Sequence, residues 1–141
     1  MTRSDIEALL ERHRQAFMSR DPARLAAGHT ELGTFESPAA GIVRGRADIE
    51  NVYKYWVAAF PDMDFTWRDP VIDGHRVALF WHFKGTSAGE FFGHVKPGKR
   101  VEFLGAGEYN LSPEGIVRAR HIFDFTGSLV SAGVLKVKPA E

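Results

Sequence analysis

Cysteine is absent from the 141 residues of this chain. Without a thiol the protein has no disulfide, no thiolate metal site and no cysteine nucleophile. Its six histidines occur at none of the H-x-H, H-x3-H or H-E-x-x-H spacings that place two metal ligands on one helix or strand. The sequence therefore predicts that no metal is bound.

Net charge and long apolar runs are missing as well. Eighteen basic residues balance eighteen acidic ones, so no overall field attracts nucleic acid or an anionic membrane. No stretch approaches the roughly 18 apolar residues of a membrane helix. Residues 1–7 are too polar to form the core of a signal peptide. We expect no nucleic-acid partner, no membrane contact and a cytoplasmic location.

Apolar and aromatic residues are, by contrast, abundant. The chain is 44% hydrophobic and 12% aromatic, enough to fill a core and to line a pocket. A single hydrophobic core typically occupies roughly 100–150 residues, and no linker or repeat divides the sequence. We expect one domain over residues 1–141.

The order of the predicted elements indicates the fold class. Apolar residues at helical spacing predict helices over residues 4–19, just after Asp21-Pro22 and over 46–59, the first opened by a Ser4–Glu7 capping box. Period-two patterns then predict strands at residues 63–68, 71–73, 76–84, 90–94, 101–111 and 116–125. Helices followed by strands with hairpin-length connections are typical of an α+β domain, with a mostly antiparallel sheet and helices on one face.

The strand predicted at residues 76–84 is apolar on both faces. Its odd positions are all apolar, as expected beneath helices, and its even positions include Phe80 and His82. An antiparallel sheet with two apolar faces usually has a cover for the second one. We expect a homodimer through the outer face of the sheet, and we assign His121 and Phe123 of the last strand to that face too.

A carboxylate in apolar company marks the end of the last strand. Asp124 follows Phe123 and precedes Phe125, and counting by two places it on one face with Ile122 and Arg120. Loss of water around a carboxyl group raises its pKa towards neutrality, as a general acid or base requires. The alternatives are an exposed aspartate at a strand end and a structural ion pair with an arginine.

Several short motifs in this order resemble those of the SnoaL-like polyketide cyclases and related ester cyclases. The matching segments are a G-T-x-x-G-x-F-x-G pattern at residues 85–93, an A-F-P-D helix end at 59–62, a G-x-x-x-I helix start at 45–49, a P-G-K-R-V turn at 97–101 and a G-I-x-R-x(5)-D closing strand at 115–124. The turn lacks the family's usual threonine, and the closing strand lacks a basic residue before Ile116. The resemblance covers about residues 5–130.

The resemblance implies a cone-like α+β barrel, in which a curved, mostly antiparallel sheet wraps around the N-terminal helices and leaves an apolar cavity. It further implies that Asp124 is the acid/base aspartate of a cofactor-free intramolecular aldol cyclisation. Ser87 and Phe80 stand where the family often has histidine and arginine, so the substrate is expected to differ. The same fold also hosts isomerases, hydrolases and pure binding modules.

These considerations give a candidate site. His29 and His94 are the further candidates for a catalytic role, His29 because it follows the second helix and His94 because it lies at a strand end. The expected pocket wall consists of aromatic residues from the helices and strands: Phe17, Phe35, Tyr53, Trp56, Phe60, Trp81 and Phe83. The predicted function is acid/base chemistry, without cofactor, on an apolar carbonyl compound; the alternative is a non-catalytic small-molecule binding module.

Overall fold

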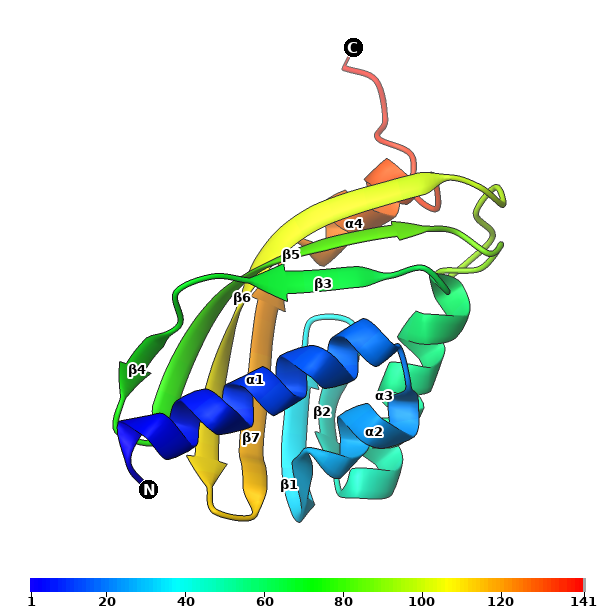
Figure 1. Cartoon of the computed structure of the whole chain (residues 1–141). Helices are drawn as coiled ribbons and strands as arrows, with labels where there is room; N and C mark the ends of the chain where they lie inside the picture. The colour runs from blue at the N-terminus through cyan, green and yellow to red at the C-terminus, as the bar shows by residue number, and fades with distance from the viewer. Residues whose placement is uncertain (141) are drawn as a thin grey trace.

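A curved sheet with three helices on its concave side forms the body of the protein. The structure is a computed structural model that describes residues 1–140. In Figure 1, α1 runs across the sheet while α2 and α3 pack beside it. The elements are α1 (Arg3–Ser19), α2 (Pro22–Ala27), β1 (His29–Ser37), β2 (Gly41–Arg44), α3 (Arg46–Ala59), β3 (Asp64–Trp67), β4 (Val71–Asp73), β5 (Arg76–Thr86), β6 (Arg100–Ser112), β7 (Gly115–Phe123) and α4 (Phe125–Ala132).

The sheet is open and almost entirely antiparallel. Its strands lie in the order β2-β1-β7-β6-β5-β3, and β4 pairs with the first residues of β5. Only β1 and β7 run parallel, which the long connection through α3 and the middle strands permits. The predicted α+β class, with a curved and mostly antiparallel sheet around N-terminal helices, is confirmed.

Helix α1 buries the stripe that its sequence predicts. Ile6, Leu10 and Phe17 lie on the side that faces the sheet and are almost fully buried. The capping box, however, is formed by Thr2 and Asp5 rather than by Ser4 and Glu7. The side chain of Asp5 accepts the Thr2 N–H at 2.7 Å, and the Thr2 hydroxyl accepts the Asp5 N–H at 3.1 Å.

Several segments differ from the sequence prediction, among them β2 and residues 29–33 of β1, which had not been expected as strands. Residues 90–94 form one isolated bridge between Glu90 and His94 instead of a strand. The backbone turns there through Gly93, which has φ +146° and leaves no room for a Cβ beside Val134. The last strand ends at Phe123, and the following residues form α4, which no sequence pattern had predicted.

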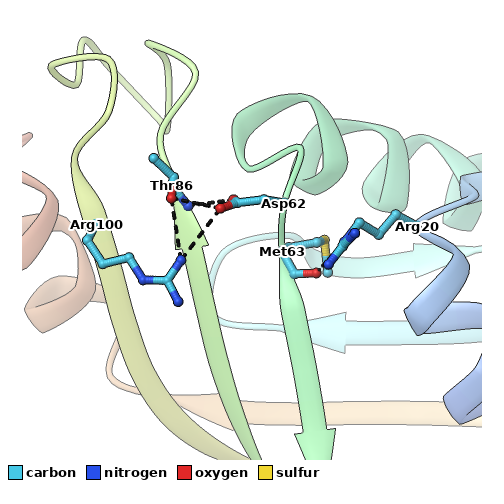
Figure 2. A network of polar contacts seen from close by, with 5 residues as sticks. All are labelled: Arg20, Asp62, Met63, Thr86 and Arg100. Carbon is cyan, nitrogen blue, oxygen red and sulfur yellow. Dashed lines mark hydrogen bonds and ion pairs between the residues drawn. The ribbon is translucent and has the colours of Figure 1, made fainter.

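A polar network fastens the end of α3 to the far end of β5. Figure 2 shows Asp62, in the link between α3 and β3, facing Thr86 and Arg100. The two Asp62 carboxylate oxygens accept the Thr86 N–H and hydroxyl, each at 2.7 Å. Arg100 lies 3.5 Å from the same carboxylate. On the other side of the link, Arg20 donates from Nε to the Met63 carbonyl at 2.8 Å, which ties the end of α1 to β3.

These bonds hold the pKa of Asp62 below its ordinary value of 3.8, with the Thr86 N–H as the largest cause and the Thr86 hydroxyl as the next. The folded state therefore favours the ionised carboxylate. The stability that this preference gives is present above about pH 4 and is lost as the pH falls through the lowered pKa.

We expect Asp62→Ala to lower the free energy of unfolding by about 1 kcal/mol, since a charged hydrogen bond contributes about 1.5–3 kcal/mol and exposure to solvent reduces that. Urea unfolding followed by circular dichroism at pH 7 measures the loss. The control is Asp64→Ala, at the exposed first residue of β3. Equal losses for the two variants would show that the network contributes nothing.

Candidate functional site

An aromatic pocket lies between α1, α3 and the concave face of the sheet, with a cavity volume of ≈ 60 Å³. Its lining residues are Phe17, Phe35, Ser37, Val52, Tyr53, Trp56, Met63, Phe65, Trp81, Phe83, Phe103, His121 and Phe123. Nearly all the wall is carbon, so the pocket suits a ligand with an apolar body.

Burial varies along the lining of the pocket. Tyr53 and His121 are buried, whereas Val52, Trp56 and Phe123 are only partly buried. These partly buried residues lie on α3 and at the end of β7 that leads into α4. The more exposed part of the lining therefore lies at α3 and at this end of the sheet.

Two glycines of β6 make room for the ring side chains of the inner wall. Gly105 pairs with Trp81 of β5, and a Cβ at Gly105 would collide with the Trp81 ring. Gly107 pairs with His121 of β7, and its Cβ would lie 2.9 Å from the His121 Nδ1. Because these two glycines have no side chain, the Trp81 and His121 rings can lie against β6.

His121 is held by two hydrogen bonds. Trp81 donates from Nε1 to the His121 Nδ1 at 3.1 Å, and the His121 Nε2 lies 3.3 Å from the Tyr109 hydroxyl. Because the indole N–H can only donate, the neutral ring must carry its hydrogen on Nε2. Burial lowers the pKa of His121 to about 4. His121 is therefore a neutral ring at pH 7, with its lone pair committed to Trp81.

Tyr53 supplies the second polar group. Its hydroxyl lies 2.7 Å from the Nε2 of His29, at the start of β1, and both side chains are buried. Arg46 fixes the backbone of His29 by donating twice to its carbonyl, at 3.1 and 2.8 Å. Burial raises the pKa of Tyr53 well above 10.0. Burial, with His121 and Arg46 adding to it, lowers the pKa of His29 to about 3. Both groups are neutral near pH 7.

Six of the seven aromatic residues predicted for the pocket wall do lie along this pocket; their role in binding a substrate stays a prediction. Phe60 is the exception. It is fully buried behind the wall, with its ring centroid 5.1 Å from Phe83 and 5.0 Å from Phe91. It supports the wall and has no surface towards the cavity.

The placement of Asp124 in the pocket is wrong. Its side chain is exposed and caps α4, accepting the Gly127 N–H at 2.8 Å. The strand alternation ends at Phe123, so counting by two beyond that residue assigns no face. His94 is also exposed, in the loop between β5 and β6, and does not line the pocket. Of the three predicted catalytic residues, only His29 lies beside it, behind Tyr53.

The assignment of His121 and Phe123 to the outer face is wrong as well. Both line the pocket, and the outward residues of β7 are Arg118, Arg120 and Ile122. The sequence held a usable signal, since two arginines on one face of a strand indicate solvent. An inward-facing Asp124 is incompatible with that signal, because it would place Arg118 and Arg120 on the inner face too.

Sequence reasoning also missed part of the pocket lining, whose members come from every layer: Ser37, Val52, Met63, Phe65 and Phe103. Phe65 stacks on Phe17, with ring centroids 4.3 Å apart, and Phe103 stacks on Phe123 at 5.3 Å. The alternation of residues within each strand predicts which face Phe65 and Phe103 take. It does not predict that β3 and the start of β6 curve over the same cavity.

Comparison with known proteins gives the family. The model for the SnoaL-like polyketide cyclases matches residues 7–130. The chain belongs to this family, as the sequence motifs predicted. No curated protein sequence matches the chain.

Solved structures share the fold at low identity. AclR from Streptomyces galilaeus, a proposed hydroxylase, is 24% identical with a TM-score of 0.81, over 98% of this chain and 87% of that one. A protein of ketosteroid isomerase-like fold from Catenulispora acidiphila, solved with trimethylamine, is 17% identical with a TM-score of 0.75, over 89% and 92% of the two chains. An LEH-like epoxide hydrolase of M. tuberculosis is 14% identical with a TM-score of 0.71, over 93% and 91%.

Within residues 1–140, no helix is long and apolar enough to cross a membrane, and no three potential ligand side chains are grouped as a metal site would require.

The buried histidines predict that acid destabilises the protein. Unfolded, each titrates near pH 6.5. Folded, His121 and His29 stay neutral down to pH values near 4 and 3, and burial lowers the pKa of His13 well below 6.5 too. The unfolded state therefore binds more protons below about pH 6.5, and each histidine removes up to about 1.4 kcal/mol per pH unit.

Urea unfolding between pH 7.5 and 5 tests this prediction. We expect the free energy of unfolding to fall by several kcal/mol and His13→Phe to reduce the slope by about one proton. The control, His75→Gln, changes an exposed histidine and should leave the slope unchanged. A flat profile for the wild type would contradict the prediction.

Proposed function

We propose that the protein acts on an uncharged, largely apolar carbonyl compound in the aromatic pocket, with the Tyr53 hydroxyl as the hydrogen-bond donor to the carbonyl oxygen. The observation that carries the proposal is the Tyr53–His29 pair, 2.7 Å apart, of which Tyr53 lines the largely apolar cavity. Such a pocket binds the apolar body through its walls and orients the polar group at its end.

The pair can present a donor to the ligand. When the His29 Nε2 carries the ring hydrogen, it donates to the Tyr53 oxygen, and the hydroxyl hydrogen of Tyr53 is free for the cavity. A carbonyl oxygen in the pocket favours this arrangement because it accepts that hydrogen. A donor fixed in a dry site stabilises the negative charge that develops on a carbonyl oxygen during enolisation or ring closure.

The size of the cavity constrains the ligand. Its ≈ 60 Å³ hold roughly four to six water molecules. A ring compound therefore enters only if wall side chains move, and the partly buried Trp56, Phe103 and Phe123 at the open end are the ones with room to do so. Flat aromatic or alicyclic ketones fit this demand best.

The second candidate function is binding without catalysis. No carboxylate lines the pocket among the described residues, and the Nδ1 lone pair of His121 already accepts the Trp81 N–H. The pocket lining therefore offers no general base with a free lone pair. A carrier or accessory module needs no such base.

A pair of matched ligands tests the role of Tyr53. Trp56 and Trp81 line the pocket, so quenching of tryptophan fluorescence reports binding. We expect Tyr53→Phe to weaken 2-acetylnaphthalene binding by roughly fivefold, about 1 kcal/mol for one neutral hydrogen bond, and to leave 2-ethylnaphthalene unchanged. Equal effects on both ligands would sink the assignment of Tyr53 as a carbonyl donor.

Deuterium exchange at the methyl group of 2-acetylnaphthalene separates the two functions. An enzyme of the proposed type accelerates the exchange in D2O, and Tyr53→Phe slows it by about 100-fold, the usual effect of losing such a donor. A wild-type protein that binds the ketone without accelerating exchange is the binding module.

We further propose that the protein is a homodimer through the outer face of the sheet. Phe80, Leu104 and Ile122 are 65%, 73% and 63% exposed there. Phe80 and Ile122 both lie opposite Ala106, on either side of β6, so they form one row across three strands. Arg76–Glu108 and Arg120–Glu36 ion pairs border the row, as the polar rim of an interface does.

In a two-fold dimer each residue of this row meets the same patch on its partner. We expect light scattering to give twice the mass of one chain, and Leu104→Lys with Ile122→Lys to give a folded monomer because four charges then enter the interface. The matched control, Val71→Lys with Val137→Lys, adds the same charges at exposed positions outside β6 and β7. A monomeric wild type at micromolar concentration would refute the dimer.

A further inference from the structure

A second hollow lies behind the pocket. It is a surface groove of ≈ 290 Å³ between α1, α2 and the turn that joins β6 to β7. Its lining residues are Leu9, Arg12, His13, Ala16, Arg24, Ala27, Gly28, Pro113, Glu114 and Gly115. None of these residues lines the aromatic pocket, so the two hollows are separate.

His13 forms the inner wall of the groove. It is only 3% exposed, yet it belongs to the groove lining. A Cβ built on Gly28 would lie 3.3 Å from the His13 Nδ1. Gly28 has φ −72° and ψ −15°, which any residue can adopt. The backbone therefore does not require glycine here; the missing side chain instead avoids a tight contact with Nδ1, which is itself buried at the groove wall.

Three buried ring nitrogens at this place have no hydrogen-bond partner within residues 1–140. They are Nδ1 and Nε2 of His13 and Nδ1 of His29. The His29 Nδ1 points away from Tyr53, because Nε2 makes that contact. Buried polar atoms are almost always paired, with protein or with ordered water, since an unpaired one costs about 1–3 kcal/mol. Three in one place indicate a site for a small polar ligand.

The two histidine rings that carry the unpaired atoms are close to Tyr53, since the ring centroids of His29 and Tyr53 lie 5.6 Å apart. The ring centroids of His13 and His29 are 5.8 Å apart, and those of His13 and Tyr109 are 5.7 Å apart. The hydroxyl of Tyr109 accepts from the Nε2 hydrogen of His121, so its own hydrogen also needs an acceptor. From solvent inwards, the order is therefore the groove, His13, His29 and then Tyr53, which lines the aromatic pocket.

We propose that the inner end of the groove is a binding site for ordered water, held by His13 and within reach of His29, and that this water connects the Tyr53 hydroxyl to solvent without passing through the mouth of the pocket. When Tyr53 gives its hydroxyl proton to the carbonyl oxygen of a ligand, His29 returns a proton to Tyr53 from Nε2 and takes one at Nδ1 from the water, which solvent reprotonates. Both groups are then neutral again, with the ring hydrogen of His29 moved from Nε2 to Nδ1.

Water fits the site better than an ion does. A neutral imidazole offers one N–H and one lone pair, which a water molecule matches, and a buried water typically makes about three hydrogen bonds. An anion near Arg12 and Arg24 would meet the carboxylate of Glu114 and the carbonyl end of α2. A cation would meet the two arginines.

The path rests on the proposed function only in its last step, because it gives the Tyr53 hydroxyl a proton connection when a ligand fills the pocket. A ligand that seals the mouth would otherwise isolate Tyr53 from solvent. The water site itself can be tested on the protein without any ligand.

Exchange of the ring hydrogens with solvent tests the site. In ¹⁵N-histidine-labelled protein, water-saturation transfer measures the exchange of the His29 ring hydrogen. We expect Gly28→Ala, which narrows the access to His13, and His13→Phe, which removes both nitrogens, each to slow this exchange by about tenfold or more, since it then depends on local opening of the structure. Glu114→Gln alters the same groove without narrowing it and serves as the matched control, with no change expected.

A high-resolution crystal structure of the wild type provides the second measurement, which holds even if a variant fails to fold. Electron density within hydrogen-bonding distance of the His13 Nδ1 or Nε2 supports the site. Empty density there, or exchange that Gly28→Ala leaves unchanged, overturns it. Slowed exchange in a protein that binds no ketone would keep the water path and reject only the proposed function.

Discussion

The structure depends on keeping polar aromatic groups neutral inside an aromatic core. His13, His29 and His121 are buried together with Tyr53 and Tyr109, and burial alone is the largest cause of every shift in their pKa values. A charged ring there would lose its hydration without gaining an opposite charge, a far larger cost than that of an unpaired neutral group. The core therefore tolerates these residues only as hydrogen-bonding, uncharged rings.

The fold provides the shielding that this requires. Helix α1 runs across the sheet (Figure 1) and contributes His13 to the groove and Phe17 to the aromatic pocket. The sheet can approach so closely because Gly105 and Gly107 carry no side chain where Trp81 and His121 lie against β6. A pocket bounded by such a layer discriminates by charge: an ionised ligand would lose its hydration just as the rings would, whereas a neutral carbonyl compound needs one donor.

Sequence patterns predict the parts of this fold in which one period governs many residues. The stripe of α1 and the apolar positions of β5 are of this kind, because burial of each residue is reinforced by its neighbours three, four or two positions away. The motifs of residues 85–93 and 115–124 also predict the family to which the chain belongs. Element boundaries lack such reinforcement. The last strand ends at Phe123 because Asp124 caps α4 through the Gly127 N–H. Starting the alternation from Asp124, which lies outside the strand, reverses the predicted face of every residue counted from it.

The site was less predictable than the fold for a related reason. His121, Tyr53 and His29 come from β7, α3 and β1, and their meeting depends on the curvature of the sheet, which the sequence does not encode residue by residue. The family resemblance implies a catalytic carboxylate at Asp124, whereas the polar groups that line or adjoin the pocket are imidazoles and phenols. Because a histidine with a lowered pKa and a tyrosine with a raised pKa both stay neutral at pH 7, the buried polar groups of this chain offer hydrogen bonds and not charges.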